Sequence, residues 1–144
     1  MEIGALSKAY YVRKLEPTDV IYDVCRGNPV FYQYHPPFVT RESIWEDMTA
    51  LPPGKSGEDK FYVGYFEGEA LVGILDLILD YSESGIAFIG FFMTNAAYQR
   101  RGIGSKIIGE AITYLKSLGY REIRLGVDRG NPQSYAFWRK NGFS

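Results

Sequence analysis

Cysteine, histidine and long apolar runs are all scarce in this sequence. Its one cysteine, Cys25, cannot form an internal disulfide, and its one histidine, His35, has no recognisable catalytic motif around it. So few thiols and imidazoles do not fit a four-ligand zinc site, and we expect no metal. Cys25 is predicted to be a small buried apolar residue, and His35 to be structural.

No stretch of the sequence reads as a membrane or export segment. The apolar runs are far too short to span a bilayer. The start of the chain, Met1 to Gly4, lacks the basic stretch and apolar core of a signal peptide. We therefore expect a cytoplasmic protein with no membrane partner.

Charge of one sign is not in excess either. The formal net charge is -1 and the pI is about 5.9, whereas a protein that binds a nucleic-acid backbone normally has a clear basic excess. No nucleic-acid partner is expected. Hydrophobic residues make up 46% and charged residues 23% of 144 residues, which is typical of one globular domain. Residues 1–144 are predicted to form that single domain.

The hydrophobic period changes along the chain in the order strand, two helices, three strands, helix, strand, helix. Strands are expected at 10–15, 61–66, 70–79, 86–94 and 121–127; helices at 20–24 (ending at 28–29), 40–51, 102–118 and 131–142. The strand at 86–94 is apolar on both faces and should lie inside the sheet. The pattern predicts an α/β sandwich with a mixed sheet.

The passage from strand 86–94 into the following helix has the features of an anion site. It reads Gln99-Arg100-Arg101-Gly102-Ile103-Gly104-Ser105. A helix start leaves backbone N–H groups without partners and has a partial positive charge. Glycines let a bulky anion come close, because no Cβ intervenes. The segment is therefore predicted to bind a diphosphate, although a tight turn between strand and helix would use the same glycines.

Two other nucleotide motifs fail on the residues. The dinucleotide fingerprint needs a third glycine where this chain has Ile107. The Walker A pattern finds its ending in Gly54-Lys55-Ser56, but Thr49 stands at its first glycine and no buried strand precedes it. Neither motif is present.

Residues 86–143 resemble the core of the GNAT superfamily of N-acetyltransferases. Gln99, Gly102 and Gly104 match the family motif Q/R-x-x-G-x-G/A. A second family element follows at the expected distance, matched by Asn131, Ser134, Phe137-Trp138, Lys140 and Gly142-Phe143. The resemblance implies a mostly antiparallel sheet flanked by helices. It also implies transfer of acetyl from acetyl-CoA directly to an amine of a small molecule or peptide. The alternative is a non-catalytic acyl-CoA-binding module of the same fold.

The resemblance also implies which residues contact acetyl-CoA. The diphosphate would lie on the amides of Arg100 to Ser105, a stretch that includes Arg101 and Ile103. The pantetheine arm would pair with the backbone of Phe92, Met93 and Thr94, as an added strand does. An N–H near Phe92 or Met93 would stabilise the oxyanion. Asn131 would bond the pantetheine arm, or would cap the helix that begins at Pro132. Trp138 stands on the same cofactor side.

The reaction also needs an acid and a base, and the sequence offers one candidate for each. Many relatives use a tyrosine as the acid, but this chain has Trp138 at that position, which cannot donate a proton in that way. Tyr135 lies about one helical turn away and is the candidate substitute; packing and a water acid are the alternatives. For the base, Asp76 interrupts an apolar strand, where a carboxylate needs a partner or a use. A bulged or solvent-facing position would also explain it.

The acceptor pocket is expected from the first two helices and their connection. The aromatic segment 31–38 can form its wall or a lid over the core. The family continues past this Gly-Phe pair with two more strands. We therefore expect that the C-terminal strands are missing, either because the chain is truncated or because something unusual replaces them. Without them, strand 121–127 would be an open edge. A homodimer is compatible with this fold.

Overall fold

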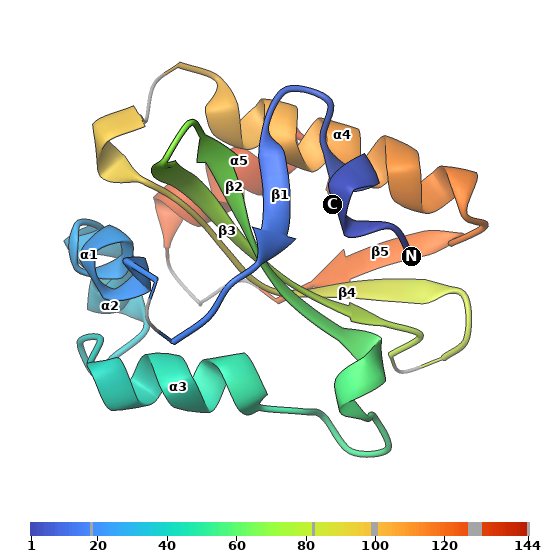
Figure 1. The fold of residues 1–144 in the computed structure, drawn as a ribbon, viewed down its shortest axis with the longest axis horizontal. Coiled ribbons are helices and arrows are strands. Elements are labelled where there is room, and N and C mark those ends of the chain that lie inside the picture. The colour runs from blue at the N-terminus through green and yellow to red at the C-terminus, as the bar shows by residue number, and fades with distance from the viewer. Residues whose placement is uncertain (18, 82, 99–100, 127–130, 144) are drawn as a thin grey trace.

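The described residues form one five-stranded sheet whose strands follow chain order (Figure 1). The computed structural model describes residues 1–17, 19–81, 83–98, 101–126 and 131–143. The strands are β1 (Tyr11–Lys14), β2 (Lys60–Glu67), β3 (Ala70–Leu79), β4 (Ile86–Thr94) and β5 (Glu122–Leu125). The first four pair antiparallel and β5 pairs parallel to β4, which confirms a mixed, mostly antiparallel sheet.

Five α-helices are described, and one of them was not predicted. They are α1 (Ile21–Arg26), α2 (Pro29–Tyr34), α3 (Arg41–Thr49), α4 (Ile103–Ser117) and α5 (Pro132–Lys140). Short 3-10 turns lie at Ile3–Leu6, Gly57–Asp59 and Ala96–Tyr98. The prediction ended the first helix at 28–29. Gly27 does end α1, but Pro29 then begins α2, because a proline loses no hydrogen bond at a first helical position.

The sheet has a separate hydrophobic core on each face. On one face α4 packs its apolar stripe, Ile103, Ile107, Ile108, Ala111 and Leu115, against the strands. On the other face α1 and α3 contribute the buried residues Ile21, Val24, Cys25 and Ile44. β3 is buried on both sides from Leu71 to Leu79. At roughly 1.5–3 kcal/mol for each large apolar side chain buried, these two layers fix both faces of the sheet.

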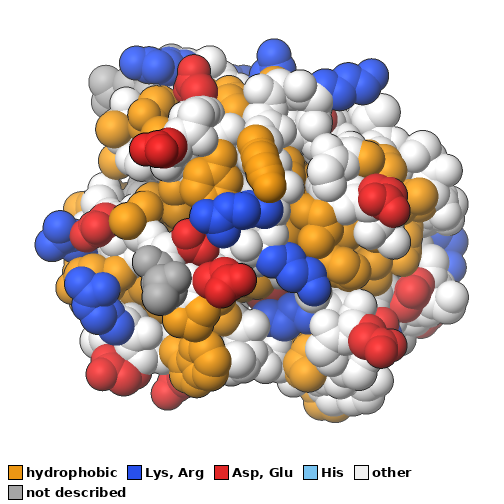
Figure 2. Space-filling model, in the orientation of Figure 1, with side chains coloured by type: hydrophobic (Ala, Val, Ile, Leu, Met, Phe, Trp, Pro, Cys, Tyr) orange, Lys and Arg blue, Asp and Glu red, His pale blue; other side chains and the backbone are white. Residues whose placement is uncertain are grey.

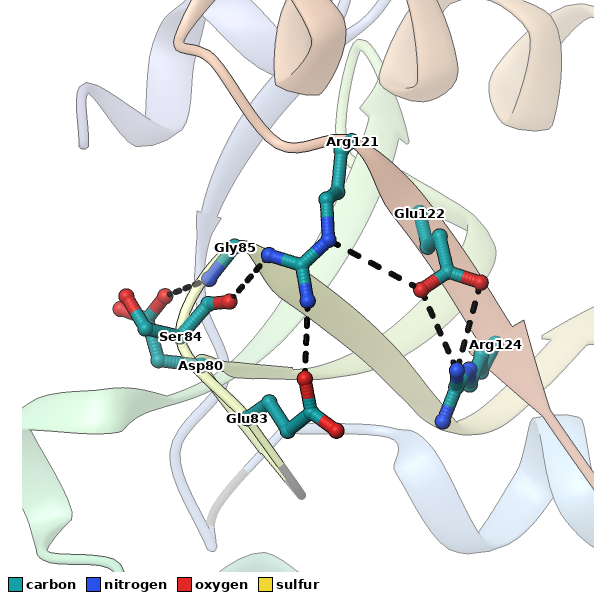
Figure 3. A network of polar contacts seen from close by, with 7 residues as sticks. All are labelled: Asp80, Glu83, Ser84, Gly85, Arg121, Glu122 and Arg124. Atoms are coloured by element: carbon teal, nitrogen blue, oxygen red, sulfur yellow. Dashed lines mark hydrogen bonds and ion pairs between the residues drawn. The ribbon is translucent and has the colours of Figure 1, made fainter.

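A polar network ties the start of β4 to the start of β5 (Figure 3). The guanidinium of Arg121 donates to the Ser84 carbonyl at 2.6 Å and lies 2.9 Å from the Glu83 carboxylate. On the other side of the turn, the Asp80 carboxylate accepts from the Gly85 N–H at 2.8 Å. These contacts hold the β3–β4 turn against the chain entering β5.

β5 is shorter than the prediction, with Glu122–Leu125 in place of 121–127. Ile123 and Leu125 are half-buried on the same face, as the alternation predicted. Val127 lies outside the described residues. The short β5 matters because, among the described residues, it pairs with β4 only from Ile86 to Ile89.

The molecular surface is of mixed character. The face drawn in Figure 2 shows acidic and basic side chains interspersed with apolar atoms, in keeping with the net charge of -1. Among the described residues, no helix has both the length and the apolar character needed to cross a membrane.

Candidate active site

The second half of β4 has a neighbouring strand on one side only. β5 pairs with β4 from Ile86 to Ile89, whereas β3 pairs with it as far as Thr94. Within the described residues, the β4 edge from Gly90 to Thr94 is therefore not covered by β5. An uncovered strand edge presents N–H and C=O groups that an extended ligand can pair with.

A β-bulge marks the point where this open half begins. Asp76 of β3 lies opposite Phe91, but Leu77 lies opposite Ile89, so Gly90 has no partner in the register. A Cβ built on Gly90 would lie 3.0 Å from the Asp76 Oδ2 atom. Glycine at this position therefore leaves the room that the Asp76 carboxylate occupies.

The start of α4 forms a backbone cradle beside the open edge. Gly102 is the N-cap with a φ of 72°, a left-handed conformation that favours glycine. A Cβ built on Gly104 would lie 3.0 Å from the Phe137 ring. The N–H groups of the first helical residues, Ile103 to Ser105, have no acceptor within an α-helix. The local geometry therefore suits an anion close to the backbone.

The open edge and the cradle line one cleft of about 430 Å³. Three other elements complete it: the α1–α2 junction, the start of α2, and α5. The Asn28 side chain joins two of these parts, since its Nδ2 donates to the Thr94 carbonyl at 3.1 Å. The lining residues are Gly27 to Phe31, Phe92 to Thr94, Gly102 to Ser105, Asn131, Gln133, Ser134, Phe137, Trp138 and Lys140. We refer to this cleft as the donor cleft.

Asn131 lies in the donor cleft and caps α5. It is 1% exposed, and its Oδ1 accepts from the Ser134 N–H at 3.2 Å. The capping role expected from the sequence is thus confirmed. Because Asn131 also lines the donor cleft, its amide N–H₂ stands where a ligand can use it.

A second cavity of about 490 Å³ lies at the bulge end of the open half. Its walls are largely apolar, but Asp47, Lys60, Asp76 and His35 add ionisable groups to them. Aromatic rings from several elements surround them, namely Phe31, Tyr81, Phe88, Phe91, Phe92 and Trp138. We refer to this space as the acceptor cavity.

Asp76 is the buried carboxylate of the acceptor cavity. Only 6% of the residue is exposed, so the solvent-facing alternative is wrong, although the strand is indeed bulged there. Its Oδ2 lies 2.8 Å from the Lys60 Nζ, while its buried Oδ1 has no hydrogen-bond partner among the residues that the structure describes. Burial raises the pKa of Asp76 above its ordinary value, the Lys60 ammonium lowers it, and the charge of Asp47 raises it.

Asp47 adds a second carboxylate from α3. The residue is exposed as a whole, yet it lines the cavity, and desolvation on that side raises the pKa of its carboxyl above the ordinary value. The neighbouring charges of His35 and Lys60 lower that pKa. Two carboxylates, the Lys60 ammonium and the His35 imidazole thus give the acceptor cavity ionisable groups of both signs.

The donor cleft and the acceptor cavity meet. Phe31, Phe92, Ser134 and Trp138 line both of them. The rings at this junction pack on one another, with centroids of Phe92 and Trp138 5.8 Å apart. A ligand in the donor cleft and a second ligand in the acceptor cavity would therefore approach each other across the open half of β4. The arrangement suits transfer of a group from one to the other.

Most residues predicted to contact the cofactor lie along the donor cleft. Phe92, Met93, Thr94, Gly102, Ile103, Gly104, Ser105, Asn131 and Trp138 are all among its lining residues. Arg101 is not: it is exposed, and its guanidinium lies 5.4 Å from the centre of the Tyr98 ring. Gln99 and Arg100 lie outside the described residues.

The two predicted catalytic residues have different positions. Asp76 lies in the acceptor cavity, but Tyr135 is 44% exposed and lines neither cavity. Successive helical residues point about 100° apart, and α5 is docked so that Ser134, the neighbour of Tyr135, faces both cavities. The structure thus does not bring Tyr135 to the site.

Sequence reasoning missed three polar residues of the site: Asn28, Asp47 and Lys60. Asn28 was interpreted only as a helix stop, and Asp47 is one of several acidic residues on an amphipathic helix. Lys60 begins a strand and is 8% exposed, which is unusual for a lysine. The available signal was a lysine directly before the apolar run 61–66, together with a lone aspartate, Asp76, in the next run, 70–79.

A comparison with sequence families identifies the kind of protein that has this site. The model of the family described as Acetyltransferase (GNAT) family matches residues 22–143. The match includes β2 to β5 and all five α-helices apart from the first residue of α1, so it covers both cavities.

Two curated proteins show moderate sequence similarity. Spermidine N(1)-acetyltransferase of Thermoplasma acidophilum is 28% identical over 96 residues, which cover 67% of this chain and 58% of that protein. An uncharacterised N-acetyltransferase of Methanocaldococcus jannaschii is 26% identical over 153 aligned positions, covering 99% of this chain and 64% of that protein. The chain thus spans about three fifths of the length of these relatives.

Solved structures share the fold. An acetyltransferase from Thermus thermophilus superposes with a TM-score of 0.78 at 22% identity, covering 94% of this chain and 87% of that one. The PaiA N-acetyltransferase of Thermoplasma acidophilum, solved in complex with coenzyme A, gives a TM-score of 0.67 at 23% identity, covering 94% and 89%. At these identities the likeness concerns the fold.

Proposed function

The chain belongs to the GNAT family of acetyltransferases, and from this premise we propose that it transfers acetyl from acetyl-CoA directly to the amine of a small cationic acceptor. The observation that supports this most is the meeting of the donor cleft and the acceptor cavity at Phe31, Phe92, Ser134 and Trp138. Direct transfer needs both substrates within contact distance, and a shared junction of this kind supports transfer without a covalent enzyme intermediate.

The donor cleft fits acetyl-CoA in its local chemistry. The amides of Ile103, Gly104 and Ser105 would hold the diphosphate, with space secured by Gly102 and Gly104. The uncovered edge from Phe92 to Thr94 would pair with the pantetheine arm, and an N–H near Phe92 or Met93 would donate to the acyl oxygen. When bound, acetyl-CoA supplies a thioester whose C–S bond breaks as the acceptor nitrogen forms the new amide bond.

The acceptor cavity supplies a base and a charge. Asp76 would take the proton that the acceptor nitrogen loses, through its unpartnered Oδ1 atom. The raised pKa of this carboxyl makes it a better proton acceptor than an ordinary aspartate. Asp47 would attract a positive charge elsewhere on the acceptor, and the aromatic walls suit both an apolar portion and a cation. The curated relative that acts on spermidine is consistent with a cationic acceptor.

Trp138 stands where many relatives have a tyrosine that acts as the acid. Ser134 offers a hydroxyl group in its place, since this residue lines both cavities. We propose that it donates a hydrogen bond to the leaving sulfur, while solvent supplies the proton. Trp138 packs against Phe92 and would limit the entry of bulk water at this point.

The test has two stages. First, thermal stabilisation is measured with acetyl-CoA and CoA, with ATP as the control. A ligand at about 100 times its dissociation constant raises the free energy of unfolding by about 2.7 kcal/mol. Second, acetyl-CoA-dependent thiol release is measured with spermidine, an aminoglycoside and a neutral amine. We expect both CoA forms to stabilise the protein and the cationic amines to release thiol. Binding without thiol release from any amine would instead identify a non-catalytic acyl-CoA-binding module.

A further inference from the structure

Lys60 and Asp76 form an ion pair in which both residues are buried. Lys60 is the first residue of β2 and is 8% exposed, and Asp76 on the neighbouring strand is 6% exposed. Removing both charges from water costs several kcal/mol for each ion, and a well-packed apolar pair is often as stable or more stable. Stability alone therefore does not account for an ion pair at this position.

The pair is also incomplete in a particular way. The Lys60 Nζ donates to the Oδ2 atom of Asp76 at 2.8 Å, and the buried Oδ1 has no partner within the described part of the chain. An unsatisfied buried oxygen normally costs about 1–3 kcal/mol. Asp76 lines the acceptor cavity, so a donor on a ligand bound there would satisfy this oxygen.

The surroundings hold the carboxylate in one place. Gly90 at the bulge leaves space for Oδ2, and any larger side chain there would start 3.0 Å from it. The other ionisable groups that face the pair are Asp47 from α3, Tyr62 from β2 and, through Asp47, His35 beyond α2. Lys60 is thus the source of positive charge in direct contact with Asp76.

We propose that Lys60 is a positioning residue for the transfer reaction: it keeps Asp76 ionised and holds Oδ2, so that Oδ1 remains available to the acceptor's N–H. This inference rests on the proposed function and assigns a role to a residue that the family motifs do not include. During transfer, a proton would pass from the acceptor nitrogen to Oδ1, while Lys60 remains charged throughout.

The pKa directions agree with this role. Burial and the charge of Asp47 raise the pKa of Asp76, and Lys60 lowers it. Removal of the ammonium would therefore raise the pKa of Asp76 further, so that the carboxyl is protonated over more of the working pH range. Activity that depends on ionised Asp76 would then be lost at the low end of that range and would return as the pH rises.

The test compares Lys60→Gln, which keeps a hydrogen-bond donor but removes the charge, with Lys60→Arg, which keeps both. Lys55→Gln is the matched control, because Lys55 is another partly buried lysine in an ion pair, with Asp59, but it lines neither cavity. The readout is kcat/KM against pH, after a melting curve confirms folding. We expect the acid limb to move up by about one pH unit or more in Lys60→Gln, and to stay in place in Lys60→Arg and Lys55→Gln.

A direct titration of the Asp76 carboxyl by NMR, in wild type and in Lys60→Gln, tests the inference even without a known acceptor. We expect the carboxyl to titrate at higher pH in the variant. An unchanged titration, or a kcat/KM lowered equally at every pH, would mean that Lys60 is merely structural. If Lys60→Gln does not fold, the titration of the wild-type protein is the test. An Asp76 carboxyl that stays protonated at the pH of CoA-dependent activity would overturn the inference. Absence of thiol release from wild type would instead contradict the proposed function and leave the titration result standing.

Discussion

β4 has two halves that share one apolar character in sequence but differ in their surroundings. From Ala87 to Ile89 it has a strand on each side, and the network around Arg121 holds the turn before β4 against the start of β5. From Gly90 to Thr94 it has β3 on one side, and the two cavities lie along the other. The first half is built for stability, and the second leaves its backbone accessible.

The difference comes from what lies next to β4. β5 is only four residues long, so its pairing ends at Ile89. The bulge at Gly90 then turns the remaining residues and places Asp76 beside the opening. We therefore expect substitutions along the open half to change binding and rate, and those along the paired half to change stability only.

The largest effect is expected from Asp76→Asn in the open half. Loss of the proposed base should lower kcat by about 10²- to 10⁴-fold, while affinity for acetyl-CoA stays unchanged. Steady-state kinetics with a cationic amine and a binding titration with CoA measure the two quantities. Asp47→Asn is the control in the same cavity: it should raise KM for cationic acceptors and leave kcat nearly unchanged. Equal losses in the two variants would contradict the separate roles.

A smaller but clear effect on binding is expected from Gly104→Val. The new side chain begins 3.0 Å from the Phe137 ring and would fill the cradle, so affinity for CoA should fall by about 10- to 100-fold. Gly109→Val makes the same change in the same helix at a position where a Cβ meets nothing within 4 Å. Calorimetric titration should show normal CoA binding for that control. Weakened binding in both would point to a general effect on α4.

Substitutions of two neighbouring residues on α5 test which of them acts on the leaving sulfur: Ser134, which lines both cavities, or Tyr135, which the sequence predicted. Ser134→Ala removes a hydroxyl that both cavities share, so kcat should fall by a few-fold to about tenfold. Tyr135→Phe changes an exposed residue outside both cavities and should leave kcat unaltered. The rate of thiol release at saturating substrates measures this. The reverse order would restore Tyr135 as the acid.

The smallest effect is expected from Arg121→Ala in the paired half. Its ion pair with Glu83 is solvent-exposed on both sides, so the free energy of unfolding should fall by only about 0.5–1 kcal/mol. Urea unfolding measures this change, and KM for acetyl-CoA should not move. A change in KM would show that the paired half of β4 affects ligand binding along the open half. That result would contradict the separation of the two halves.

Much of the architecture was predictable because its signals are local. The ranges 70–79 and 86–94 match β3 and β4 as observed, since both are apolar runs bounded by turn residues. The helical stripe of α4 and the glycine just past its end, with a φ of 99° at Gly119, were equally clear. Helix α2 was not predictable, because the same proline that ends one helix can begin the next.

The site was predictable in part. The glycines of the cradle and the backbone of Phe92 to Thr94 followed from motif spacing, and the structure places them along one cleft. The contact of Lys60 with Asp76 joins residues sixteen positions apart, through a strand register that no local pattern specifies. Which of Ser134 and Tyr135 faces the cleft depends on how α5 docks, and a rotation of about 100° would exchange them.

The fold class, the family and the glycines at the start of α4 could be predicted without a structure, because periodicity, turn residues and motif spacing act within a few residues of one another. Three features needed the three-dimensional arrangement: the point where β4 loses its neighbour among the described residues, the carboxylate that is buried, and the side chains that line both cavities. Those features depend on strand register, on the bulge at Gly90 and on helix docking, which are set by packing between segments far apart in the chain.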